Sequence, residues 1–330
     1  MTMKSALTPI VAALAAAFAL ALPAAALAQA APEAKAAKPA ASSPTKAAAK
    51  QRSFATPEEA AKALVDAVKA SDVNGLVEIV GPASRAWLFT GDKVADANEW
   101  KLFAAAYETK HALVKDGEAK AILNVGKDDF PFAAPIVKRG DKWAFDAEAG
   151  REEITNRRVG RNELDTIQTL LAIVDAQREY ASLDADGNGL RDYAARFLST
   201  PGKKDGLYWA TKAGEPQSPL GPLAAKAVKE GYGGKGRTGQ PEPYNGYFFR
   251  MLTAQGANAP GGKYDYLVGG KLFGGFAVVA YPAKYGVSGV MSFIVNHDGV
   301  VYEKDLGGDT ASVAGRMSRF DPDKTWKKAP

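Results

Sequence analysis

Four side chains that carry oxygen ligands are spaced as in a calcium-binding loop. At loop positions 1, 3, 5 and 9 stand Asp184, Asp186, Asn188 and Asp192. Gly189 falls at position 6, where such a loop turns sharply, but Ala195 takes position 12, which normally supplies a bidentate Glu. The spacing therefore predicts calcium as the candidate cofactor, bound at millimolar affinity. The alternative is that these residues end a helix and form a turn.

A second candidate site is a set of aromatic residues with one arginine, in segments rich in Gly and Pro. Its members are Tyr208, Trp209, Tyr244, Tyr247 and Arg250. Their rings could stack on a sugar or on a partner chain, which would make them a ligand or partner surface. The alternative is that they anchor long loops to the core. A chain without disulfides needs such anchors.

The common catalytic constellations are absent from this sequence. The chain has no cysteine and only two histidines, His111 and His297, and we expect the second to be solvated in a hairpin turn. It also lacks the Gly-x-Ser-x-Gly elbow, the His-Glu-x-x-His zinc motif and a complete phosphate loop. A pair of carboxylates remains open as a catalytic device, but sequence alone does not select the two acids.

Residues 53–150 should form an α+β unit in which helices come before strands. Helix starts are predicted at Thr56, which precedes Pro57, at Asp72, and at Asp96, where Glu99 completes a capping pattern. The expected strands are Ala119–Val125, Phe132–Lys138 and Lys142–Phe145. In pattern this resembles the cone-shaped domains of the nuclear-transport-factor-two-like group, in which helices cover a curved sheet and leave a pocket.

Residues 151–330 should form a second unit, with a long helix and an antiparallel meander. An apolar stripe predicts a helix over Arg161–Leu183. The expected strands are Tyr247–Leu252, Phe276–Tyr281, Val290–Val295 and Val300–Lys304, the last two joined by the turn Asn296–Gly299. This outline is that of a pilin-like domain, so the whole chain is predicted to be α+β.

Six segments carry a family resemblance. They are Gly187–Ala194, Asp205–Trp209, Ser218–Pro222, Pro243–Arg250, Tyr285–Phe293 and Val301–Leu306. Together they resemble the bacterial domain-of-unknown-function family 2950, from about Phe54 to Trp326. The resemblance implies an exported protein without an assigned activity. The family's Pro-Tyr-x-Gly-Tyr segment usually carries His where this chain has Asn245, which weakens the case for a catalytic imidazole there.

The N-terminal residues predict export to the periplasm or secretion. Lys4 precedes an apolar run over Leu7–Leu22, and Ala26-Leu27-Ala28 is a cleavage pattern, so residues 1–28 read as a signal peptide removed before Gln29. We expect no transmembrane segment after its removal, because the run is shorter than a spanning helix requires. Residues 29–52, rich in Ala, Pro and Lys, are predicted to be a disordered tether. It is either a plain spacer or a cationic segment that contacts anionic lipid or cell-wall polymer.

The charge balance gives no sign of nucleic acid binding. Residues 1–52 hold six of the 42 Lys and Arg and one of the 37 Asp and Glu, which leaves 36 of each kind in residues 53–330.

The predicted export, the cationic tether, the neutral body and the missing catalytic constellations together give the leading hypothesis, a non-catalytic periplasmic binding or structural module, monomeric or a small oligomer. Its partner would be an envelope polymer or a protein. The alternatives are a hydrolase that cleaves envelope polymer with a carboxylate pair, and a pilin-like assembly component.

Overall fold

The protein has an α+β fold with two hydrophobic cores. The computed structural model describes residues 50–330 except 186, 188, 213 and 233–241, so the predicted signal peptide and nearly all of the predicted tether lie outside the described residues. One core gathers buried residues between Phe54 and Ala147, and the other gathers buried residues between Ile167 and Phe320. No described helix has the length and apolar character needed to cross a membrane.

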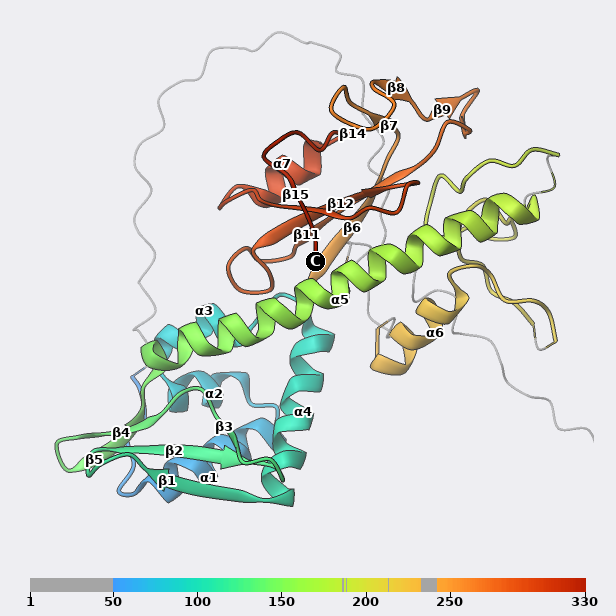
Figure 1. The fold of residues 1–330 in the computed structure, drawn as a ribbon. Helices are drawn as coiled ribbons and strands as arrows, with labels where there is room; N and C mark the ends of the chain where they lie inside the picture. The colour runs from blue at the N-terminus through green and yellow to red at the C-terminus, as the bar shows by residue number, and fades with distance from the viewer. Residues whose placement is uncertain (1–49, 186, 188, 213, 233–241) are drawn as a thin grey trace, which may run out of the picture.

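The first unit packs short helices on an antiparallel sheet (Figure 1). Its sheet has the order β1-β2-β4-β5, with β3 paired to β2. The helical elements are α1 (Pro57–Lys69), α2 (Val73–Val80), a 3-10 turn (Pro82–Ser84), α3 (Arg85–Leu88) and α4 (Lys93–Thr109). The strands are β1 (His111–Lys115), β2 (Lys120–Val125), β3 (Phe130–Pro131), β4 (Ile136–Arg139) and β5 (Lys142–Phe145).

Two of the three predicted helix starts are confirmed. Thr56 accepts a hydrogen bond from the Glu59 amide and caps α1, while Asp72 caps α2 through the Gly75 amide. The predicted cap at Asp96 is wrong, because Asp92 caps α4 and accepts from the Val94 and Ala95 amides. The predicted strand over Phe132–Lys138 is also wrong in its extent, since β3 ends at Pro131 and β4 begins only at Ile136.

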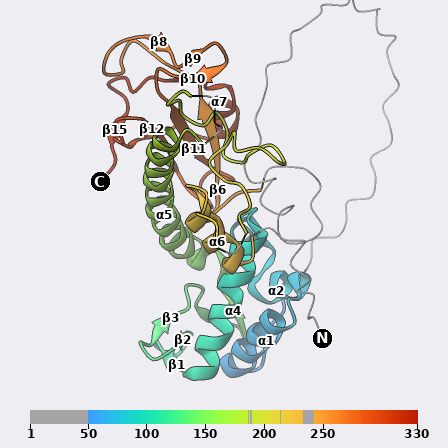
Figure 2. The ribbon, with the colours of Figure 1, turned by 90° about the vertical axis from the view of Figure 1, so that its right-hand side faces the viewer.

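Helix α5 (Ala147–Leu183) is 37 residues long and joins the two units (Figures 1 and 2). It begins earlier than the predicted Arg161, because Asp146 caps it by accepting from the Ala149 amide. Its first turns lie over the first unit, and its later turns contact β11 and β12 of the second. The predicted unit boundary at residues 150 and 151 therefore falls inside a continuous helix of about 55 Å.

The second unit is built on a meander in the order β15-β13-β12-β11-β6. Between β6 and β11 the chain forms four short strands, β7 to β10. Helix α6, which precedes β6, lies beside α5 (Figure 1). The helices are α6 (Gly221–Glu230) and α7 (Thr310–Arg316). The strands are β6 (Tyr247–Leu252), β7 (Ala254–Gln255), β8 (Tyr264–Asp265), β9 (Leu267–Val268), β10 (Lys271–Leu272), β11 (Ala277–Pro282), β12 (Met291–Asn296), β13 (Tyr302–Asp305), β14 (Arg319–Phe320) and β15 (Lys327–Lys328).

Helices α5 and α7 cover opposite faces of the meander. On β6, Arg250 donates to the Ala314 carbonyl at the end of α7, whereas the sulfur of the next residue, Met251, contacts Gln177 of α5. Neighbouring residues of a strand point to opposite faces of its sheet. The sheet is thus enclosed between the two helices, which explains why β11 is buried along nearly its whole length.

Two glycines of α5 should respond in opposite ways to the same substitution. A Cβ at Gly150 would lie 2.7 Å from the Cα of Ala134, a backbone atom that cannot move aside alone, whereas a Cβ at Gly160 would meet nothing within 4 Å. We expect Gly150→Ala to cost about 1–3 kcal/mol of unfolding free energy through overpacking. Gly160→Ala should stabilise by about 0.5–1 kcal/mol through helix propensity. Urea unfolding of both variants measures this, and equal effects would contradict the close approach of α5 to Ala134.

Candidate functional site

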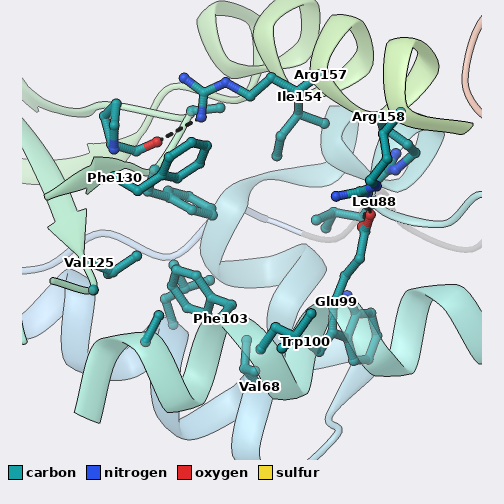
Figure 3. A pocket seen from close by; sticks show the side chains of 18 of the residues that line it. Val68, Leu88, Glu99, Trp100, Phe103, Val125, Phe130, Ile154, Arg157 and Arg158 are labelled. Atoms are coloured by element: carbon teal, nitrogen blue, oxygen red, sulfur yellow. Dashed lines mark hydrogen bonds and ion pairs between the residues drawn. The ribbon is translucent and has the colours of Figure 1, made fainter. Parts of the chain in front are cut away.

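The first unit encloses a cavity of about 520 Å³ between α4 and α5 (Figure 3). Most of its wall is apolar, with α1, α2 and α3 on one side and the segment that follows β2 on the other. The apolar lining residues are Leu64, Val68, Leu76, Leu88, Trp100, Leu102, Phe103, Ala106, Val125, Phe130, Pro131, Phe132, Ala133 and Ile154. Its volume lies within the range of about 300–1,000 Å³ that is usual for small-molecule sites.

Helix α4 shows that this cavity is open. The helix carries Trp100, Phe103 and Leu102, yet Asp96 is its only buried residue. Trp100 and Phe103 are half-buried, and Leu102 at the rim is 71% exposed. On a helix that packs against a filled core, such side chains would be covered. The inner side of α4 therefore packs against the first core only in part, and it leaves Trp100 and Phe103 partly exposed to the cavity.

Three arginines of α5 supply the positive charge of the cavity. Arg157, Arg158 and Arg161 line it, and the lining acids are Glu99 and Asp128. Arg158 is 7% exposed, and its Nη1 donates to the Trp87 carbonyl oxygen over 2.7 Å. All three cations come from one helix, so the positive charge lies along one wall, while the rest of the lining is apolar apart from Glu99 and Asp128.

Glu99 is held by two of these arginines. Nη2 of Arg158 lies 3.2 Å from Oε2 of Glu99, and Nη2 of Arg161 contacts Oε1 of the same carboxylate. Arg158 is nearly covered, whereas the Arg161 side chain is 57% exposed. The carboxylate of Glu99 is thus fixed as the partner of a cationic pair.

Arg157 lies at the rim of the cavity, as Figure 3 shows. Its Nη1 donates to the Pro131 carbonyl oxygen over 3.0 Å, and its guanidinium lies 4.4 Å from the centre of the Phe130 ring. Its Nε donates to Glu153 over 2.6 Å. The ring of Phe130 is 55% exposed, so an apolar surface and a cation meet at the opening.

The predicted aromatic set is not assembled on one surface. Tyr244 and Tyr247 are buried, and their hydroxyls bond to the Glu230 carboxylate and the Met291 carbonyl oxygen. Nη2 of Arg250 donates to the Ala314 and Met317 carbonyl oxygens and so caps the end of α7. These three residues fit the anchoring alternative. Tyr208 and Trp209 are half-buried against the second core, with Lys204 over the Trp209 ring, and their ligand role stays a prediction.

The calcium loop stays a prediction as well, because Asp186 and Asn188 lie outside the described residues. The two described acids already have protein partners: Asp184 Oδ2 accepts from the Gly189 amide over 3.0 Å, and Asp192 lies 3.6 Å from Nζ of Lys271. Among the described residues no group of three or more His, Cys, Asp or Glu is arranged to hold a metal. An ion here would have to compete with Lys271 for Asp192.

The histidines offer no catalytic pair. His111 stacks on Tyr107 in the first unit, and His297 packs its ring edge-to-face with Tyr266 in the second. The expected solvation of His297 holds only in part: its side chain is 24% exposed, but its Nδ1 is buried and bonds to no described residue. The turn at Asn296–Gly299 folds its side chain back against the core.

Comparison with known proteins gives one match that covers nearly the whole chain. A family model with the description "Protein of unknown function (DUF2950)" matches residues 51–329. No curated protein matches the chain, and no solved structure matches it either. The matched range includes both units and the cavity.

Proposed function

Since the chain belongs to the DUF2950 family, whose description assigns no activity, its role has to be inferred from its own site, and we propose that the first unit is a binding module for a small, largely apolar ligand. One observation carries the proposal. Trp100 and Phe103 on the inner side of α4 pack against the first core only in part and line an open cavity of about 520 Å³. Open apolar surface of this kind is costly unless a ligand covers it.

We propose that this module is non-catalytic and works in the periplasm. The sequence of residues 1–28 supports export. The charged groups of the cavity support binding rather than catalysis, because Glu99 is ion-paired to both Arg158 and Arg161 and so is poorly placed to exchange protons. The hydrolase and the pilin-like alternatives have no comparable structural support in the described residues.

The proposal predicts that filling the cavity abolishes the binding of a neutral apolar probe. The intact protein should bind N-phenyl-1-naphthylamine at one site, with increased fluorescence. Ala106 lines the cavity, whereas Ala105, the preceding residue on α4, is exposed. Ala106→Trp should therefore weaken probe binding at least about tenfold, because the indole occupies the apolar space.

Ala105→Trp is the matched control for that experiment. It adds the same indole to the same helix on its outer side, so it corrects for tryptophan emission and for changes in helix stability. Circular dichroism checks that both variants are folded. If the intact protein binds no probe, or if the two variants bind it equally, the cavity is not a ligand site and the proposed function is wrong.

A further inference from the structure

The polarity of the cavity indicates the chemistry of its ligand. Its three cations, Arg157, Arg158 and Arg161, all come from α5, and the walls formed by α1, α2 and α4 are apolar apart from Glu99. Figure 3 shows Arg157 and Arg158 on α5. Resting on the proposed binding function, we propose that the ligand is an amphipathic carboxylate, with an acyl-like body in the cavity and an acidic group against α5.

Arg161 is the side chain best placed to meet the acidic group. Its side chain is 57% exposed, and its guanidinium contacts Glu99 through Nη2. Arginine presents five N–H donors in a planar fork, so a second carboxylate can bind while the contact to Glu99 is kept. Arg157, one helical turn earlier at the i, i−4 position, is on the same face of α5 and borders the same opening.

Arg158 has a different role, as a positioning residue. It is nearly covered, and its two contacts, to the Trp87 carbonyl oxygen and to Glu99, leave its Nε buried and without a hydrogen-bond partner among the described residues. By holding Glu99 it sets the place of Arg161. Glu99 therefore both orients the exposed cation and competes with a ligand for it.

Matched ligands test this inference. Dodecanoic acid and dodecan-1-ol have the same tail and differ in charge, and displacement of N-phenyl-1-naphthylamine from the full exported chain measures both. At pH 7.5 and low salt the acid should bind at least about tenfold more tightly than the alcohol, because a charge-assisted contact in an apolar site is strong. Arg161→Gln should bring the ratio of the two affinities close to one. Glu99→Gln should raise it, because the competing carboxylate is removed.

Arg151→Gln supplies the control for the change in net charge. It removes the same charge from the same helix at a side chain that is 62% exposed and does not line the cavity, so the ratio should stay as in the intact protein. Equal affinity for acid and alcohol, or an acid preference that survives in Arg161→Gln, would overturn the inference and leave the proposed function standing. Absence of any probe binding would instead remove the proposed function itself.

Discussion

Asp92→Ala is expected to lower the free energy of unfolding by about 3–5 kcal/mol, because four donors then lose their acceptor in a buried place. Oδ1 of Asp92 accepts from the Val94 and Ala95 amides at the start of α4. Its Oδ2 accepts from the Tyr232 hydroxyl over 2.7 Å and from the Gly246 amide over 3.0 Å, both in the second unit. Urea unfolding followed by tryptophan fluorescence measures the loss.

Asp72→Ala is the matched control for this prediction. Asp72 is also the N-cap of a helix, but it is exposed and accepts one amide, that of Gly75. Its loss should cost about 1 kcal/mol, the usual value for a cap. If both variants lose the same stability, Asp92 acts only as a cap, and its bonds to Tyr232 and Gly246 do not stabilise the junction between the units.

The regular elements of this fold could be predicted where local signals agree. The span of β6 was predicted in full, since Tyr247–Leu252 is a short apolar run behind a Gly turn. The caps at Thr56 and Asp72 were found because one side chain serves one helix start. At Asp92 and Asp96 two acids compete for one start, and only the structure shows that Thr90 donates to Asp96 and leaves the capping role to Asp92.

Helices α6 and α7 were missed for a related reason. Each is short, and at the start of each helix no side chain accepts a capping hydrogen bond from a backbone amide. The sequence therefore carries little local signal for either helix. Their formation depends on packing against the second core and on side chains from elsewhere in the chain that donate to the carbonyl oxygens at their ends. Arg250 of β6, for example, holds the end of α7 from 64 residues away in the chain.

The cavity was expected only in outline, from the likeness of the first unit to cone-shaped domains. Trp100 and Phe103 have the spacing of a core-facing stripe. The sequence does not show whether the side chains of such a stripe are fully covered by the core or partly line a cavity. Its cationic wall was missed, because Arg157, Arg158 and Arg161 precede the stripe from which the long helix was predicted. Their position over α4 depends on the early start of α5 at Ala147.

The junction between the units also contains a carboxyl group whose charge is costly. Asp96 is 6% exposed, and burial raises the pKa of its carboxyl to about 6, although the Thr90 hydrogen bonds and the nearby Arg158 favour the charged form. The negative charge of Glu99 acts in the opposite direction to Arg158 and raises the pKa of Asp96. Lys284 of the second unit also faces this carboxyl, while its Nζ donates to carbonyl oxygens on either side of Trp87. The Asp96 carboxyl is thus surrounded by charged groups of α4, α5 and the second unit.

We expect this group to make the protein less stable as pH rises from about 4 to about 6. In that window the folded state keeps a proton on Asp96 that the unfolded chain has released, so raising the pH favours unfolding. Ionisation in the folded state should cost on the order of 3 kcal/mol by pH 7. Asp96→Asn keeps an acceptor for Thr90 and removes the titration. Urea unfolding at pH 4.5 and at pH 7.5 gives the unfolding free energy of the variant minus that of the intact protein, and we expect this difference to be more favourable to the variant at pH 7.5. Asp66→Asn, at an exposed carboxyl of α1, controls for net charge. A gain in Asp96→Asn no greater than in Asp66→Asn would show that the buried carboxyl does not set this pH dependence.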